Sequence, residues 1–260
     1  MPAVSRLSAL APLVLLLACD FDLGEPDRYQ RLTLSAAELT SLRIDAGAGD
    51  LTIAADPEAV DITIVAGIHG DHTEISHART GTTLELTDNC ASWHRCAVDW
   101  RVTVPTELAA ELDTGAGDIH VTGLTGSVHA TTGSGDIRVT GLTGSLRATT
   151  GSGDIDLADL AGDVNVDTGS GDITGERLQV TKFHGETGSG DLALELSNRP
   201  RSVWWSSGSG DVDVSVPAGA YALDLETGLG DIDLAGVRRD PAADATLRLH
   251  TGLGDITVAG

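Results

Sequence analysis

The sequence predicts an all-β protein, a parallel β-solenoid built from coils of about 18–20 residues with Gly-x-Gly-Asp corners. Three observations lead to this prediction. The Gly-x-Gly-Asp motif occurs nine times, apolar and polar residues alternate on both sides of it, and the chain has 32 glycines but only 3% aromatic residues. A repeat of this length is typical of a solenoid, in which each coil stacks on its neighbours along the chain.

The Gly-x-Gly-Asp motif marks a sharp bend, because glycine adopts the positive φ angles that a tight corner needs. From Asp118 onward, consecutive motif aspartates are 18 to 24 residues apart. In stacked coils these aspartates would lie along one edge, roughly 5 Å from each other. The nine corner aspartates are Asp50, Asp118, Asp136, Asp154, Asp172, Asp191, Asp211, Asp231 and Asp255.

Strands are expected before and after each corner. The residue after every corner aspartate is Leu, Ile or Val, and the residue eight positions before it is also apolar in all nine copies. Such alternation is typical of strands with one buried face. A second turn recurs within the coil, as at Gly123–Gly126, and a Thr or Ser precedes eight of the nine corners. We expect the hydroxyls of this column to contact one another along the stack.

The N-terminus is predicted to be a targeting segment. Arg6 precedes an apolar run from Leu7 to Ala18 that is too short to span a bilayer. The run ends in Leu-Leu-Ala-Cys, which resembles a bacterial lipobox, and the resemblance implies lipid on Cys19. We therefore divide the chain into a signal peptide (1–18), an acidic tether (19–30), irregular N-terminal coils or a cap (31–110) and regular repeats (111–260).

Two further cysteines are predicted to pair. Cys90 and Cys96 flank a short segment, and a disulfide there agrees with a location outside the cytoplasm. The alternative is a metal site of both cysteines with His94, although structural zinc normally has four ligands.

The net charge of −23 argues against nucleic-acid binding, which requires a basic surface. An acidic solenoid is well solvated and repels anionic surfaces. Its repeated aspartates need compensation for their mutual repulsion. One interpretation is that each carboxylate accepts hydrogen bonds from amides of its own corner, as in an Asx turn. The alternative is calcium between coils, although Gly-Ser-Gly-Asp departs from the calcium-binding nonapeptide.

Two other groups are candidate sites. The segment from His69 to His77 holds three histidines and two acids, and it is interpreted as a polar loop, with a metal site as the alternative. Trp205 falls in an inward column. Trp204 falls in an outward column between His184 and Asp224, where it is a candidate for stacking on a ligand unless a neighbouring segment covers it.

The repeated motif resembles a bacterial family of domains of unknown function, the putative-adhesin family. The matching residues are Val102–Pro105 leading to Asp113–Ile119, and Val214–Pro217 leading to Glu226–Ile232. The resemblance spans about residues 40–260. It implies an extracytoplasmic β-solenoid, often associated with the cell envelope, but it assigns no functional residues.

We therefore expect a lipid-anchored envelope protein that binds or scaffolds a glycan or protein partner, with no catalytic residues and no cofactor. The alternatives are a polysaccharide-active β-helix enzyme, which would need paired carboxylates, and a calcium-stabilised stalk.

Overall fold

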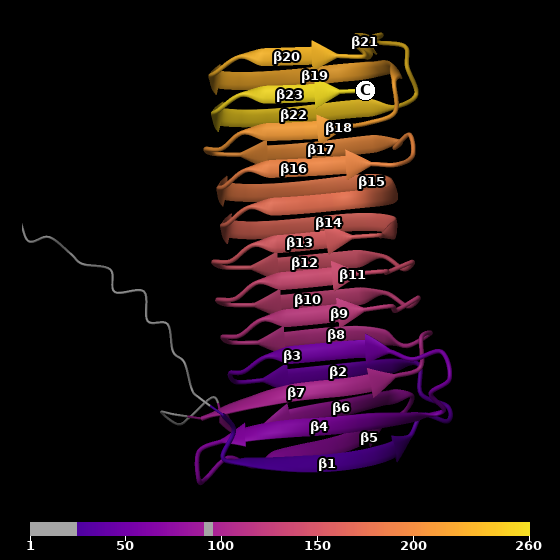
Figure 1. The fold of residues 1–260 in the computed structure, drawn as a ribbon, viewed down its shortest axis with the longest axis vertical. Helices are drawn as coiled ribbons and strands as arrows, with labels where there is room; N and C mark the ends of the chain where they lie inside the picture. Colours follow the sequence, from indigo (N-terminus) through magenta and orange to yellow (C-terminus); the bar gives the residue numbers. More distant parts are fainter. Residues whose placement is uncertain (1–24, 91–95) are drawn as a thin grey trace, which may run out of the picture.

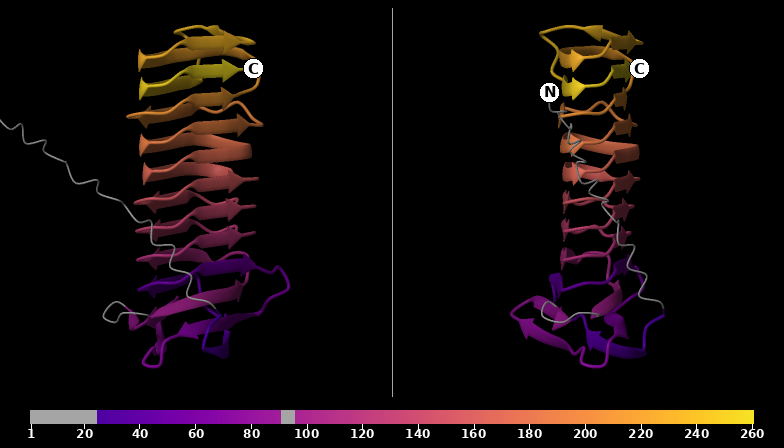
Figure 2. Two further views of the ribbon diagram at one scale, coloured as in Figure 1. Left: turned by 60° about the vertical axis from the view of Figure 1, so that its left-hand side comes forward. Right: turned by 90° about the vertical axis from the view of Figure 1, so that its left-hand side faces the viewer.

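The computed structural model describes residues 25–90 and 96–260, and within them it contains strands but no α-helix. The strands stack into a rod in which two sheets face each other (Figures 1 and 2). The predicted all-β solenoid is therefore confirmed. In the described ranges there is accordingly no helix long and apolar enough to cross a membrane.

Each regular coil places one strand in each sheet and bends between them at its Gly-x-Gly-Asp corner. Neighbouring coils are parallel and in register, with Val128 beside Leu146 in one sheet and Ile137 beside Ile155 in the other. Sheet A contains, in stack order, β3 (Leu51–Ala55), β9 (Ile119–Thr122), β11 (Ile137–Thr140), β13 (Ile155–Ala158), the start of β15 (Ile173–Ser189), β16 (Leu192–Leu196), β18 (Val212–Ser215), β23 (Ile256–Ala259) and β20 (Ile232–Ala235). Sheet B contains β2 (Ser41–Ala46), β8 (Ala109–Thr114), β10 (Val128–Thr132), β12 (Leu146–Thr150), β14 (Ala161–Ser170), the end of β15, β17 (Ser202–Ser207), β22 (Thr246–Leu253) and β19 (Gly219–Leu229).

The core lies between the two sheets and follows the predicted columns. Along β11 and β12 every second side chain is buried, and Ile137 and Val139 are completely inaccessible. Trp205 is also fully buried, as its inward column predicted. Each buried Val, Leu or Ile contributes about 1.5–3 kcal/mol relative to an exposed one, so the repeated columns stabilise the whole stack.

The N-terminal end of the rod departs from the parallel pattern. β7 (Ala97–Val104) and β6 (Thr83–Asp88) lie parallel to β3 and β2. Beyond them, β4 (Asp61–His69), β1 (Arg28–Ser35) and β5 (Ile75–Thr80) pair antiparallel. The lower part of Figure 1, coloured from indigo to magenta, shows these strands at the end of the stack.

The expectation that coils stack strictly in chain order is wrong at both ends. The β2–β3 coil pairs directly with the β8–β9 coil, although the chain between them runs through the N-terminal strands. The last coil, β22–β23, lies between β17–β18 and β19–β20 (Figure 1). Because every coil presents the same inward columns, any two coils can be neighbours, and the connecting segments decide which are.

Candidate functional site

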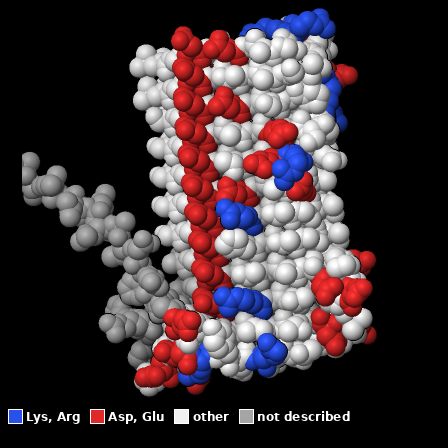
Figure 3. Space-filling model, in the orientation of Figure 1, with Lys and Arg blue, Asp and Glu red and all other residues white. Residues whose placement is uncertain are grey.

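A row of aspartates runs along one edge of the rod as the red stripe in Figure 3. Except in Asp231, which lies in the last layer, the Oδ1 atom of each corner aspartate accepts the backbone N–H of the aspartate in the next layer, as from Asp136 to Asp118 at 2.9 Å and from Asp211 to Asp191 at 2.7 Å. We call this row the aspartate ladder. In stack order it contains Asp99, Asp50, Asp118, Asp136, Asp154, Asp172, Asp191, Asp211, Asp255 and Asp231.

The ladder corrects the interpretation that each carboxylate caps its own corner. In-register stacking places the amide of the next aspartate directly beside the carboxylate, so the hydrogen bond joins two coils. The threonine column also differs from the expectation. The Thr150 hydroxyl donates to the carbonyl of Gly135 in the adjacent coil at 2.9 Å, rather than to another hydroxyl.

Close packing at the corner requires glycine. Gly153 has a φ of 149°, and a Cβ atom there would lie 2.1 Å from the Gly135 carbonyl oxygen. The corner is thus a structural joint between coils. Within the described residues, no group of three or more His, Cys, Asp or Glu side chains is arranged to hold a metal ion.

The outer face of sheet B carries a column of side chains with planar polar groups. Each pairs in register with the next, so the column follows the rod axis. We call it the planar column, and in stack order it is Arg43, Glu111, His129, Arg147, Asn165, His184, Trp204, Arg248 and Asp224.

Part of the planar column lines a shallow groove of about 470 Å³ that crosses the strands β2, β8, β10 and β12. Its floor is the backbone of sheet B, because the side chains of Leu42, Val128 and Leu146 are buried and point into the core. The groove is open because Ser127 and Ser145, which precede β10 and β12, are small. Its polar lining comprises the serine hydroxyls of Ser41, Ser127 and Ser145, with Thr83, Arg43, Glu111, His129 and Arg147.

The groove therefore offers hydrogen-bond donors from the layers of β2, β10 and β12, whereas the β8 layer contributes alanines and Glu111. Arg43 forms an ion pair with Glu111 at 3.4 Å, while His129 and Arg147 are exposed. Arg147 also lies 3.9 Å from Asp167, a weak contact between partly exposed groups.

Trp204 lies further along the planar column. Its ring stacks on His184 with 4.2 Å between ring centroids and an interplanar angle of 5°. The layer on its other side holds Arg248 rather than the expected Asp224, because β22 inserts between β17 and β19. Arg248 in turn donates to Asp224 at 2.8 Å. One face of the indole is thus used within the protein.

The outer face of sheet A holds a smaller polar cluster. Asp156 accepts hydrogen bonds from Thr174 and Arg138, each at 2.5 Å. Partial burial acts to raise the pKa of Asp156, but these hydrogen bonds and the Arg138 charge outweigh it and lower the pKa. The residues Arg138, Asp156 and Thr174 line a cavity of about 290 Å³.

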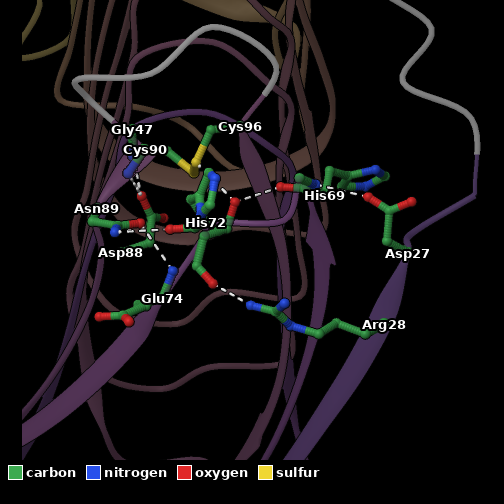
Figure 4. Close-up of a disulfide and its surroundings, with 12 residues drawn as sticks. Asp27, Arg28, Gly47, His69, His72, Glu74, Asp88, Asn89, Cys90 and Cys96 are labelled. Carbon is green, nitrogen blue, oxygen red and sulfur yellow. Dashed lines mark hydrogen bonds between the residues drawn. A yellow bond between two sulfur atoms is a disulfide. The ribbon is translucent and has the colours of Figure 1, made fainter.

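Figure 4 shows the disulfide between Cys90 and Cys96 near the N-terminal end of the rod. Since the two sulfurs are bonded to each other, the alternative metal site on their thiolates is excluded. Asp88 accepts backbone hydrogen bonds from Cys90 at 2.9 Å and Gly47 at 3.1 Å. Burial nevertheless raises the pKa of Asp88 above its ordinary value.

The three histidines of the 69–77 segment are not brought together as a metal site. His69 is buried at the end of β4 and its Nε2 lies 3.2 Å from Asp99 Oδ2, whereas His77 lies on β5. His72 lies near the disulfide in Figure 4. Cys19, with its predicted lipid, and His94 lie outside the described residues.

Asp99 is a ladder residue that the corner motif does not identify, because no Gly-x-Gly precedes it. A signal was present in the sequence. Asp99-Trp100-Arg101-Val102 has the same order of acidic, apolar, polar and apolar residues as Asp136-Ile137-Arg138-Val139. The groove had no such signal, since its lining comes from five separate segments.

Comparisons with known proteins agree with this architecture. A family model described as Toastrack DUF4097 matches residues 31–161 and again residues 160–259. A putative adhesin from Parabacteroides distasonis is similar in structure, with a TM-score of 0.58 at 14% identity over 89% of this chain and 97% of that chain. A putative adhesin from Bacteroides fragilis gives a TM-score of 0.46 at 15% identity over the same shares. No curated protein matches the chain.

Proposed function

Since the chain belongs to the Toastrack DUF4097 family, we propose that it is a non-catalytic binding module of the cell envelope, held at a membrane by lipid on Cys19. Its ligand is a linear, hydroxyl-rich polysaccharide that lies along the groove of sheet B. The observation that carries this proposal is the groove itself, in which serine, arginine and histidine donors come from three of four stacked layers.

The chemistry of the groove favours a neutral or sparsely charged polysaccharide. Guanidinium, imidazole and hydroxyl groups donate hydrogen bonds to sugar oxygens, and layers repeat roughly every 4.8 Å. An extended polymer that crosses the groove therefore meets donors in three of its four layers. A net charge of −23 repels a polyanion at longer range.

The groove gives little support to the enzyme alternative. Glycoside hydrolysis of the common kind uses two carboxyl groups on either side of the scissile bond. Of the residues lining the groove, Glu111 alone carries a carboxylate, and it forms an ion pair with Arg43.

Binding to immobilised neutral β-glucan and dextran, with polygalacturonate as the acidic comparison, tests the proposal. We expect binding to one of the neutral polymers, and Arg147→Ala and His129→Ala should each weaken it by about tenfold. Arg138→Ala is the matched control, because Arg138 is an exposed arginine on the opposite sheet. Unchanged binding in both groove variants, or no binding to either neutral polymer, would refute the groove as the site.

A further inference from the structure

Exposed apolar side chains gather at the C-terminal end of the rod. The described residues include six large apolar side chains with high exposure, and four of them belong to the last two layers. They are Leu229 (71%), Leu253 (50%), Leu234 (42%) and Ile232 (40%). Monomeric proteins seldom leave such side chains clustered without a partner.

The backbone at this end is also unpaired. Among the described strands, β20 pairs with β23 alone, and residues 222–229 of β19 pair with β22 alone. Ile232 and Leu234 occupy the column whose members in the internal coil, Ile137 and Val139, are fully buried. The final coil thus has the inward side chains of an internal coil, but no coil covers it.

The N-terminal edge is built differently. In β5, His77 and Arg79 lie opposite Leu86 and Leu84, so they share the inward side of sheet B. In β1, Arg28 and Gln30 lie opposite Ile68 and Ala66 in the same way, and the half-buried Leu32 and Leu34 occupy the rest of that side. Charged residues that point inward on an edge strand prevent further strands from pairing there. Only the C-terminal end is therefore suited to stacking.

Charge at the C-terminal end is divided between its two sides. Asp231 and Asp233 lie at the start of β20, beside the corner. Arg238 and Arg239 lie in β21 (Val237–Arg239), which pairs with the opposite end of β19 at Gly219–Tyr221. Figure 3 shows the red stripe ending at the top left and basic side chains at the top right.

We propose that the C-terminal end binds the same end of a second copy of this chain, forming a two-fold, tip-to-tip dimer. The two copies are related by a two-fold axis perpendicular to the sheets. This rotation stacks each sheet on the same sheet of the other copy, so inward side chains still face the core. It also places the corner side of one tip against the opposite side of the other tip. The acidic side of one copy then faces the basic side of the other. Since the N-terminal edges are blocked, the contact closes as a dimer and does not propagate into a fibre.

Sedimentation velocity over a range of protein concentrations, with small-angle X-ray scattering, tests this arrangement. We expect a reversible dimer whose longest dimension is close to twice that of the monomer. Ile232→Asp and Leu234→Asp should each raise the dimer dissociation constant at least about tenfold. Val60→Asp is the matched control, because Val60 is an exposed apolar residue far from the tip, and it should leave the dimer unchanged.

Charge reversal tests the two-fold geometry. Arg238→Asp with Arg239→Asp should weaken self-association, and so should Asp233→Arg, because like charges would then face each other. Mixing the two variants should restore dimers, since each then meets opposite charge. Circular dichroism and thermal melting would verify that each variant is folded.

A monomer at all concentrations would overturn the proposal, even if the tip then proved to bind another protein. A dimer insensitive to Ile232→Asp, a side-by-side dimer in scattering, or no recovery on mixing would also overturn it. None of these outcomes depends on polysaccharide binding, so this proposal and the proposed function can fail separately.

Discussion

At the scale of single residues, the corner glycines explain why the motif repeats so strictly. The second glycine of each corner has a positive φ, and a Cβ added there would overlap the carbonyl oxygen of the equivalent residue in the adjacent coil, which is Val98 for Gly49 and a glycine for the others. Both constraints arise from the coil-on-coil spacing and not from any ligand. Either serine or leucine can occupy the position between the glycines, because the side chain there points to solvent, as that of Leu229 does.

Replacing Gly153 with Ala should therefore destabilise the protein by about 2–4 kcal/mol, combining backbone strain with steric overlap. Gly81→Ala provides the control, since Gly81 has a φ of 64° but nothing within 4 Å of an added Cβ. Its cost should be about 1 kcal/mol from backbone strain alone. Urea unfolding of the two variants measures the difference, and equal costs would contradict the steric contribution.

At the scale of strands and turns, the aspartate ladder couples neighbouring coils. Each step places one backbone hydrogen bond on a carboxylate oxygen, which offsets the repulsion between adjacent negative charges. These hydrogen bonds explain how adjacent carboxylates can lie so close together without a bound cation. Substitution of Asp154 and removal of divalent cations distinguish this arrangement from a calcium-stabilised stalk.

Asp154→Asn keeps an oxygen that can accept the Asp172 amide, at 2.8 Å in the native chain, and removes one negative charge. We expect its thermal midpoint at low salt to equal or slightly exceed that of the unmodified chain. Asp154→Ala removes the acceptor and should cost about 1 kcal/mol. A large loss in Asp154→Asn would indicate that the charge itself is needed, as for a bound cation.

Removing divalent cations with a chelator should leave the thermal midpoint unchanged, because the Oδ1 atoms of the ladder aspartates already accept hydrogen bonds from the neighbouring coils. Differential scanning calorimetry before and after chelation measures this. A fall of more than a few degrees that added calcium reverses would favour the calcium-stabilised stalk.

At the scale of the whole molecule, the rod is completed by coils that are out of chain order. The coil β22–β23 fills the space between β17–β18 and β19–β20, so the last residues of the chain hold the tip in place. Solenoid stability is approximately the sum of each coil and its interfaces with its neighbours. An internal repeat and the inserted coil should therefore respond differently to deletion.

Deleting residues 137–154, one whole repeat, should give a folded rod that is shorter by roughly 5 Å, because the register of every remaining column is preserved. Deleting residues 246–260 should instead leave unpaired edges on both sides of the missing layer and cause aggregation. Light scattering and the longest dimension from X-ray scattering distinguish the two. A well-behaved monomer lacking 246–260 would show that the inserted coil is dispensable.

Much of the fold could be predicted because its signals are local. Corner glycines, the aspartates and the buried columns such as Ile137 and Val139 follow from alternation within one repeat. The disulfide and the inward position of Trp205 could be predicted for the same reason. The position of Arg248 beside Trp204 could not be predicted. The connecting segments decide which coil lies next to β17, and their path is not a local property of the repeat.

The amino-acid sequence by itself determined the coil: its two strands, its glycine corner and the side chains that face inward, since these depend on steric limits and burial over about twenty residues. Tertiary structure decided which coils became neighbours, and with them the tenth ladder aspartate, the groove of sheet B and the apolar tip. Coils with the same inward columns pair almost equally well, so only the complete path of the chain selects one stacking order.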